Sequence, residues 1–166
     1  MRVPCVMRWP GKIPAGTTCS ELCTTMDFLP TFARLAGTEP PADRILDGHD
    51  IWPLMSGQPA ARSPYEAFYY YHLGQLQAVR SGRWKLYLPL VNALGGGSKK
   101  SPARLYDLVA DLGEATNLAD KHPDVVEHLA RLGERAREDL GDINRPGRNQ
   151  RPAGMVSDPT PRLLEQ

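Results

Sequence analysis

Residues 76–88 carry the clearest structural pattern in the sequence, two short segments in which apolar residues recur at every second position. Alternation of this kind predicts two β-strands, over 76–80 and 83–88. The Ser81-Gly82 pair between them predicts a two-residue hairpin turn, which commits the two strands to antiparallel pairing. The residues that share a face are Leu76, Ala78 and Arg80 on the first strand and Trp84, Leu86 and Leu88 on the second.

A helix is predicted from Pro123 to just before Gly141. Proline suits the first position of a helix because its missing N–H group would have no partner there, and glycine suits the residue after the end. Asp124 and Glu127 complement the positive N-terminal end of the helix dipole. Apolar residues recur three or four positions apart and predict one buried face, made of Val125, Leu129, Leu132, Ala136 and Leu140.

Weaker patterns predict the remaining elements. An aromatic run at 65–72 and the segment 105–108 indicate further strands. A helix is expected between Asp27, as its N-cap, and Gly37, as its C-terminal stop. We also expect a strand through residues 2–9, loops over 9–16 and 38–64, and a tail after residue 143. The expected buried face of the Asp27 helix consists of Leu29, Phe32, Ala33 and Ala36, and that of the first strand of Val3, Cys5, Met7 and Trp9.

Composition limits the classes of partner. The 20 basic and 19 acidic residues give a net charge of +1, so the chain lacks the broad positive field typical of proteins that bind nucleic acid or anionic membranes. No stretch approaches the roughly 18 apolar residues that a membrane-spanning helix needs. Sixteen prolines and fifteen glycines indicate that much of the chain forms turns. These observations predict an α+β domain that has neither a nucleic-acid partner nor a membrane span.

Catalytic and metal-binding motifs are not found in the sequence. The three cysteines at positions 5, 19 and 23 are an odd number, and no further ligands lie close enough in sequence to complete a zinc site. Asp47 and Asp50 flank His49, an arrangement that suits either a bound cation or, more commonly, a turn in which a carboxylate accepts main-chain hydrogen bonds. We therefore assign no catalytic residue and no metal ligand.

The most promising ligand contacts lie where the aromatic strand ends in the loop 71–75. Loops carried by rigid strands often hold functional groups, and His72 stands at the edge of this one. The tyrosines at 69–71 could stack on a sugar ring, although alternation would bury one or two of them in the sheet. The alternative is that this segment only packs the sheet and forms a surface turn.

A series of short motifs, in order, resembles the formylglycine-dependent sulfatases of the alkaline phosphatase-like superfamily. Each motif is weak alone, but their shared order over residues 2–140 is specific. They are Arg-Val-Pro at 2–4, Trp-Pro-Gly-Lys-Ile at 9–13, Met-Asp-Phe-Leu-Pro-Thr at 26–31 with Leu-Ala-Gly at 35–37, Leu-Asp-Gly at 46–48 with Asp50 and Pro-Leu at 53–54, Ala-Val-Arg at 78–80 with Trp-Lys-Leu at 84–86, and Leu-Tyr-Asp-Leu at 105–108 with Asp111, Gly-Glu at 113–114 and Asn-Leu at 117–118.

This resemblance implies a division of the chain. Residues 1–57 would be the end of a large α/β catalytic domain, residues 65–142 a smaller antiparallel sheet with a C-terminal helix, and residues 143–166 a flexible tail. The family's calcium ligands and its Cys/Ser-x-Pro-x-Arg motif, the source of formylglycine, would lie in a missing N-terminal catalytic part. Without that part, apolar surface would be exposed around Val3, Phe28, Leu29 and Phe32.

The resemblance also implies a function. The complete enzyme would hydrolyse a sulfuric ester of a small molecule or glycan, and this chain would be inactive alone. Its second subdomain would line one wall of the substrate cleft, which makes Tyr71 and His72 the predicted substrate-binding residues. Such enzymes are often exported to the periplasm or secreted. The alternatives are a free-standing module that binds a glycan or a protein partner, and a portion of a related phosphohydrolase.

Overall fold

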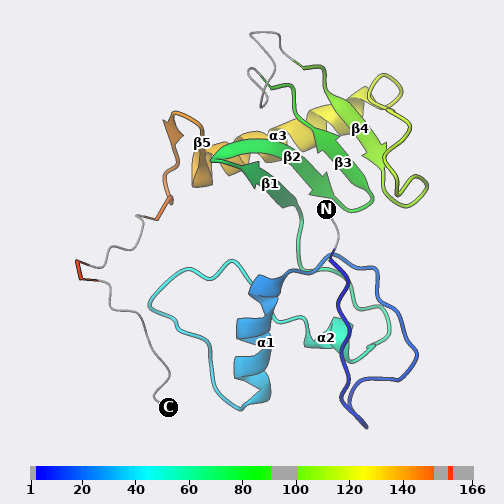
Figure 1. Ribbon diagram of the computed structural model, residues 1–166, viewed down its shortest axis with the longest axis vertical. Coiled ribbons are helices and arrows are strands. Elements are labelled where there is room, and N and C mark those ends of the chain that lie inside the picture. The colour runs from blue at the N-terminus through cyan, green and yellow to red at the C-terminus, as the bar shows by residue number, and fades with distance from the viewer. Residues whose placement is uncertain (1–2, 91–100, 152–156, 159–166) are drawn as a thin grey trace. The chain divides into compact units, whose positions relative to one another are not determined.

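The computed structural model describes residues 3–90, 101–151 and 157–158 (Figure 1). The chain divides into two compact units. The first contains the residues up to Phe68 together with Ser81–Arg83, and the second contains Tyr69–Arg80 and the residues from Trp84 onward. The α+β class is confirmed, because helices and an antiparallel sheet occur in separate stretches of the chain.

The first unit is mostly loop around short helices: a 3-10 turn at Thr25–Asp27, α1 at Phe28–Leu35 and α2 at Trp52–Met55. The strand predicted over residues 2–9 is wrong, since the described residues 3–9 form no strand, and Val3 and Val6 are 79% and 95% exposed. A strand needs a neighbour to accept and donate its main-chain hydrogen bonds, and among the described residues none pairs with this segment. The loop predicted over 9–16 is confirmed, whereas α2 lies inside a stretch predicted to be irregular.

Helical structure begins three residues before the position that the sequence indicated. Asp27 is the N-cap of α1, as predicted, although its side chain makes no capping hydrogen bond to that helix. The added 3-10 turn has Thr24 as its own N-cap, and Thr24 and Asp27 form a reciprocal capping box. Gly37 closes α1 with a φ of 76°, as predicted. Leu29 and Phe32, which lie on one face of α1, are 53% and 52% exposed. The expected apolar surface is thus confirmed at Val3, Leu29 and Phe32, whereas Phe28 is half-buried.

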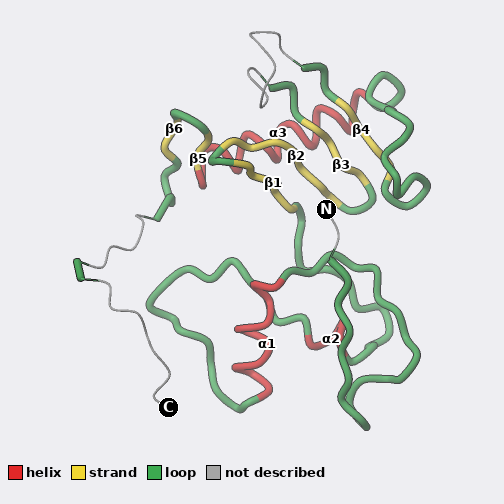
Figure 2. The backbone as a smooth tube through the Cα atoms, in the orientation of Figure 1, coloured by secondary structure: helices red, strands yellow, loops and turns green. Residues whose placement is uncertain are grey.

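The second unit is built on a four-stranded sheet of order β1-β2-β3-β4 (Figure 2). The strands are β1 at Phe68–His72, β2 at Gln75–Ser81, β3 at Trp84–Tyr87 and β4 at Arg104–Asp107. The predicted hairpin is present, but its two-residue turn is Gly82-Arg83, one residue later than expected. Strand β3 pairs antiparallel with β4, so that Leu86 lies opposite Leu105.

A second tight turn, Leu73-Gly74, joins β1 to β2 where the sequence analysis expected a longer loop. Both residues have positive φ, 48° and 79°, which is the pattern of a type I′ hairpin turn. The strict alternation predicted for β2 also fails, because Ala78 and Val79 are both buried.

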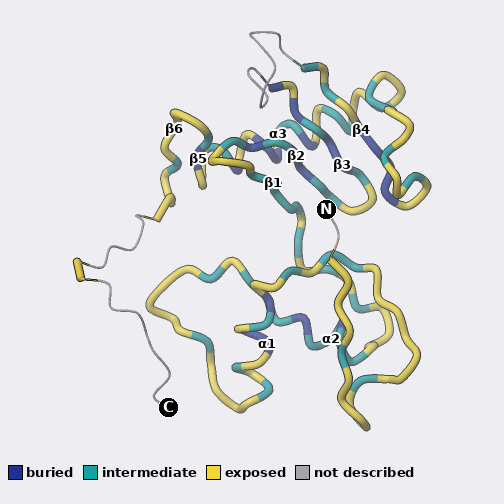
Figure 3. The backbone as a smooth tube through the Cα atoms, viewed as in Figure 1, coloured by how far each residue is buried: buried dark blue, intermediate teal, exposed yellow. Residues whose placement is uncertain are grey.

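Helix α3 at Pro123–Leu140 packs on the sheet, and the buried residues of this unit gather between them (Figure 3). Leu129, Leu132 and Ala136 are buried as predicted, but Leu140 is 37% exposed. After the helix, β5 at Gly141–Asp142 pairs antiparallel with β6 at Arg145–Pro146. The chain therefore continues in ordered structure past residue 143, where the tail was expected to begin.

Candidate functional site

The predicted substrate contacts, Tyr71 and His72, are the last two residues of β1 and lead into the Leu73-Gly74 turn. Because neighbouring residues of a strand point to opposite faces, the two side chains have different surroundings. Tyr71 is half-buried and His72 is exposed. The structure therefore leaves the imidazole accessible to solvent and holds the phenol inside the unit.

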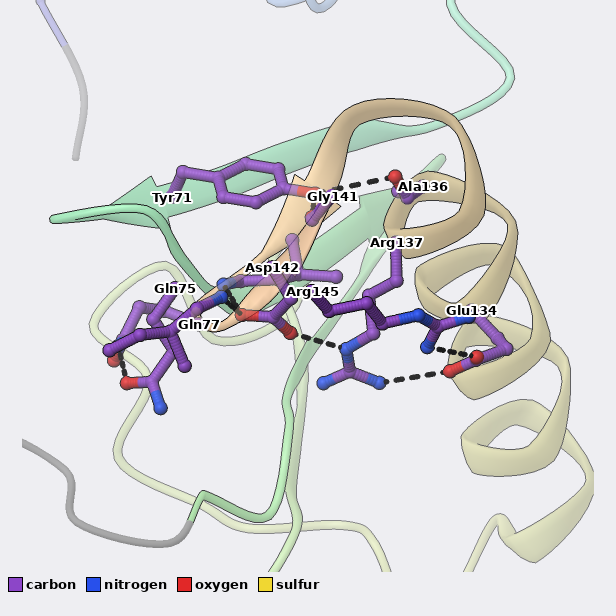
Figure 4. Close-up of polar contacts among 11 residues, drawn as sticks. Tyr71, Gln75, Gln77, Glu134, Ala136, Arg137, Gly141, Asp142 and Arg145 are labelled. Carbon is purple, nitrogen blue, oxygen red and sulfur yellow. Dashed lines mark hydrogen bonds and ion pairs between the residues drawn. The ribbon is translucent and has the colours of Figure 1, made fainter. Parts of the chain in front are cut away.

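The Tyr71 hydroxyl is bonded to the C-terminal end of α3 (Figure 4). It donates to the carbonyl oxygen of Gly141 at 2.8 Å and lies 3.4 Å from that of Ala136. Burial, together with the nearby Asp142 carboxylate, raises the pKa of Tyr71, so the phenol stays protonated at neutral pH. Carbonyls at a helix end lack intrahelical partners, and Tyr71 satisfies one of them. Its hydroxyl is thus a structural anchor.

Asp142 makes a second connection to the same hairpin, this time at β2. Its carboxylate accepts hydrogen bonds from the main-chain N–H of Leu76 at 3.1 Å and from Nε of Arg137 at 2.6 Å. Burial acts to raise the pKa of Asp142, but the Arg137 guanidinium and the main-chain donors outweigh it, and the pKa lies below the usual range. Asp142 is therefore ionised at neutral pH, and its charge is neutralised by Arg137.

Further contacts hold the segment 141–149 on α3. Arg145 forms an ion pair with Glu134 at 2.6 Å, and the main-chain N–H groups of Arg148 and Asn149 donate to the carbonyls of Glu138 and Asp139. We call residues 141–149 the C-terminal strap. Sequence reasoning missed it, and the one available signal was the Gly-Asp pair that follows the helix.

In the first unit, Asp27 is the centre of a buried polar cluster. Its side chain is fully buried and accepts hydrogen bonds from the main-chain N–H of Thr24 at 2.6 Å and of His49 at 2.8 Å, as well as from the Tyr65 hydroxyl. Burial and the bond to Asp27 raise the pKa of Tyr65 to about 12. The cluster joins three separate segments, and it gives structural roles to Asp27 of the motif at 26–31 and to His49, which follows the Leu-Asp-Gly motif at 46–48.

The second unit also contains a buried cation that the sequence analysis did not single out. The Lys85 side chain is 5% exposed, and its Nζ donates to Glu114 at 2.7 Å and to the Tyr87 hydroxyl at 2.8 Å. Burial acts to lower the pKa of Lys85, but the bonds to Glu114 and Tyr87 raise it overall. The sequence signal was a lysine inside an apolar strand. The ion pair between Lys85 and Glu114 thus connects β3 to the segment that follows β4.

The residues considered for a metal are not assembled into a site. Asp50 accepts a hydrogen bond from the main-chain N–H of Trp52 at 2.9 Å and pairs with Arg34, which fits the turn hypothesis. Residues 46–48 themselves form no turn, and Gly48 lies against the main chain of Met26. Within the described ranges, no three His, Cys, Asp or Glu side chains are grouped to hold a metal ion. None of the helices described is long and apolar enough to cross a membrane.

Comparison with known proteins identifies the family. Residues 1–139 match the family model described as N-sulphoglucosamine sulphohydrolase, C-terminal. The chain is 34% identical over 155 residues to steryl-sulfatase of Mus musculus, an alignment that covers 78% of the chain and 25% of that protein. It is 33% identical over 154 residues to arylsulfatase A of Homo sapiens, which covers 80% of the chain and 30% of the relative.

A solved structure gives the same result for the fold. A protein in complex with its substrate D-glucosamine-2-N,6-O-disulfate superposes with a TM-score of 0.57 at 26% identity, covering 78% of this chain and 27% of that one. The chain thus spans about a quarter of these relatives, 25% to 30% of their length. The ordered motifs, the small antiparallel sheet with its C-terminal helix and these matches agree. The chain belongs to the family of sulfatase C-terminal domains.

Proposed function

We propose that this chain is the C-terminal part of an enzyme that hydrolyses sulfuric esters. The observation that carries the proposal is the family match over residues 1–139, supported by sulfatases that align with more than three quarters of the chain. In this role the chain contributes the antiparallel sheet, α3 and the strap, while the chemical step belongs to the rest of the enzyme.

Calcium and formylglycine would be supplied by that other part of the enzyme. The described residues do not fit either group. No metal-holding group of side chains is present among them, and the cysteines are exposed thiols outside a Cys-x-Pro-x-Arg context. We therefore derive no catalytic step through this chain. We propose that residues 1–57 end the catalytic domain and that residues 65–142 form the smaller subdomain, to which the strap adds residues 143–149.

The proposed substrate is a sulfated small molecule or glycan. Among the similar proteins, one is named for steryl sulfates and another is bound to a disulfated glucosamine. Within this chain, we propose that the end of β1 lines one wall of the substrate cleft, with His72 as the polar contact and Tyr71 fixing its strand. The exposure of His72 and the bond from Tyr71 to Gly141 support these two roles.

The decisive experiment compares the complete enzyme with the isolated chain. With calcium and a matured formylglycine, the complete enzyme is expected to release product from 4-nitrophenyl sulfate, while the isolated chain releases none. A parallel assay with 4-nitrophenyl phosphate separates a sulfatase from a phosphohydrolase. Turnover by the highly purified isolated chain, or a complete enzyme that prefers the phosphate, would contradict the proposal.

The role of His72 is tested by His72→Ala in the complete enzyme. Loss of a polar contact that binds substrate and transition state equally raises KM and leaves kcat unchanged, so we expect KM to rise about five-fold. His128→Ala is the matched control, because His128 is an exposed histidine on α3. An unchanged KM, or an equal rise in the control, would remove His72 from the substrate wall.

A further inference from the structure

The tip of the β1–β2 hairpin contains a large apolar residue in an unfavourable backbone conformation. Leu73 has a φ of 48°, and its residue is 78% exposed. For L-residues the left-handed region brings Cβ close to the following carbonyl oxygen, and type I′ turns therefore favour Asn, Asp or Gly at this position. A leucine at this position is neither buried nor in a favourable backbone conformation.

The other residues with positive φ have evident local reasons. Asn144 is of a type that tolerates the left-handed region, and Glu114 is held by its ion pair with Lys85. Ala60 carries a small side chain in a loop. Among the described non-glycine residues with positive φ, Leu73 is thus the large apolar one, and it is exposed to solvent.

Both strands of this hairpin are fixed close to the tip (Figure 4). Two residues before Leu73, the Tyr71 hydroxyl donates to Gly141. Three residues after it, the Leu76 N–H donates to Asp142. These bonds connect the turn to the end of α3 and to the strap, so the tip is held in a defined position. Strained residues that are held by their surroundings are typical of sites that contact ligands.

We propose that Leu73 is a specificity-determining residue that packs against a hydrocarbon ring, aryl or alicyclic, in the alcohol part of the sulfate ester. This inference rests on the proposed function, because it places the hairpin end beside the substrate. A leucine side chain offers only apolar surface, which gains from covering a hydrocarbon ring and gains less from the hydroxyl-rich edge of a sugar. Leu73 therefore sets a preference between classes of sulfate ester, whereas His72 supplies the polar contact.

The test uses Leu73→Asn in the complete enzyme, because asparagine suits the backbone conformation and removes only the apolar surface. The values of kcat/KM are measured for 4-methylumbelliferyl sulfate and for glucosamine 6-sulfate. We expect the ratio of the first value to the second to fall about ten-fold, with no loss of thermal stability. Val109→Asn is the matched control, since Val109 is 75% exposed in the turn after β4 and should leave the ratio unchanged.

Three results would overturn the inference. The first is a Leu73→Asn variant in which the kcat/KM values for both esters and the melting temperature are unchanged. The second is an equal loss on both substrates, which means that Leu73 does not discriminate between them. The third is a lower melting temperature with an unchanged ratio, which means that Leu73 packs against protein. If the unmodified enzyme hydrolyses neither ester, the proposed function is overturned as well. That result differs from the three above, which overturn this inference alone.

Discussion

Gly48 shows how a single residue can determine whether the Asp27 cluster forms. A Cβ atom at this position would lie 2.0 Å from the carbonyl oxygen of Met26 and 2.4 Å from its carbonyl carbon. Both atoms belong to the main chain, so the overlap can be relieved only by moving the segment that donates the His49 N–H to Asp27.

We therefore expect Gly48→Ala to lower the free energy of unfolding of the first unit by about 3 kcal/mol. Urea unfolding followed by circular dichroism measures this change. Gly113→Ala is the control, because a Cβ there would meet its nearest atom at 3.7 Å, an ordinary contact. Equal stabilities of the two variants would contradict the steric explanation.

The Lys85–Glu114 pair predicts an asymmetric response to mutation. Lys85 is almost fully buried, whereas 24% of the Glu114 side chain is exposed. Glu114→Gln leaves an ammonium group buried without its counter-ion and should cost about 3 kcal/mol of unfolding free energy. Lys85→Met leaves a carboxylate that water can reach and should cost about 1 kcal/mol. Urea titrations of the two variants compare these costs, and the reverse order would refute the explanation.

The same pair predicts a pH dependence. Although burial opposes it, pairing with Lys85 and Tyr87 lowers the pKa of Glu114 below its ordinary value of 4.5. A lowered pKa stabilises the folded state above the unfolded-state value, and this stabilisation is lost as the pH falls through the folded-state pKa. Unfolding free energy should therefore fall less steeply below pH 4.5 in Glu114→Gln than in the unmodified protein. Urea titrations at several pH values measure this difference. An equal decrease in unfolding free energy below pH 4.5 in the two proteins would contradict this assignment.

At the scale of elements, α3 packs closely against the sheet at Gly133. A Cβ on Gly133 would lie 3.2 Å from Val79, 3.4 Å from Leu88 and 3.5 Å from Leu76. We expect Gly133→Leu to overpack this interface and to cost about 2 kcal/mol of unfolding free energy. Glu138→Leu, on the exposed face of the same helix, is the control. A Gly133→Leu variant as stable as the control in thermal melts would show that the interface tolerates a larger side chain.

Elements defined by local patterns were predictable from the sequence, and those defined by distant partners were not. The hairpin at Gly82 and the course of α3 follow from alternation, caps and apolar spacing, which act over a few residues. The strap depends on pairs such as Asp142 with Leu76, 66 positions apart. The N-terminal segment has a strand-like pattern but lacks a pairing strand in the described structure. Periodicity therefore locates an element, while its partners decide whether it forms and which face it buries.

The candidate site, too, could be predicted only in part from the sequence. Sequence reasoning correctly placed Tyr71 and His72 at the end of an aromatic strand, because strand ends are marked by composition. It did not reveal that the Tyr71 hydroxyl is bonded to Gly141, since that contact joins residues 70 positions apart. It also could not show that Leu73 has positive φ, because Leu-Gly is not among the favoured type I′ pairs.

At the scale of the whole molecule, the first unit exposes large apolar residues, two of which lie on one helix face. Val3, Val6, Leu29 and Phe32 are each more than half exposed, although isolated exposed residues of this kind are ordinary on protein surfaces. Here Leu29 and Phe32 are three positions apart on one face of α1 and form a continuous apolar strip with the half-buried Phe28. A strip of this kind is typical of a surface that another part of a protein covers.

The isolated chain should therefore bind a hydrophobic dye such as 8-anilinonaphthalene-1-sulfonate under native conditions. We expect Leu29→Lys with Phe32→Lys to reduce the dye fluorescence at least two-fold, because both substitutions replace the exposed strip by charge while the buried Pro30 and Thr31 stay in place. Val109→Lys removes a single exposed apolar residue in the second unit and should change the signal little. The same double substitution in the complete enzyme should lower its melting temperature if the strip is covered there. Weak dye binding by the unmodified chain, or an unaffected melting temperature in the complete enzyme, would mean that this face of α1 is an ordinary solvent-exposed surface.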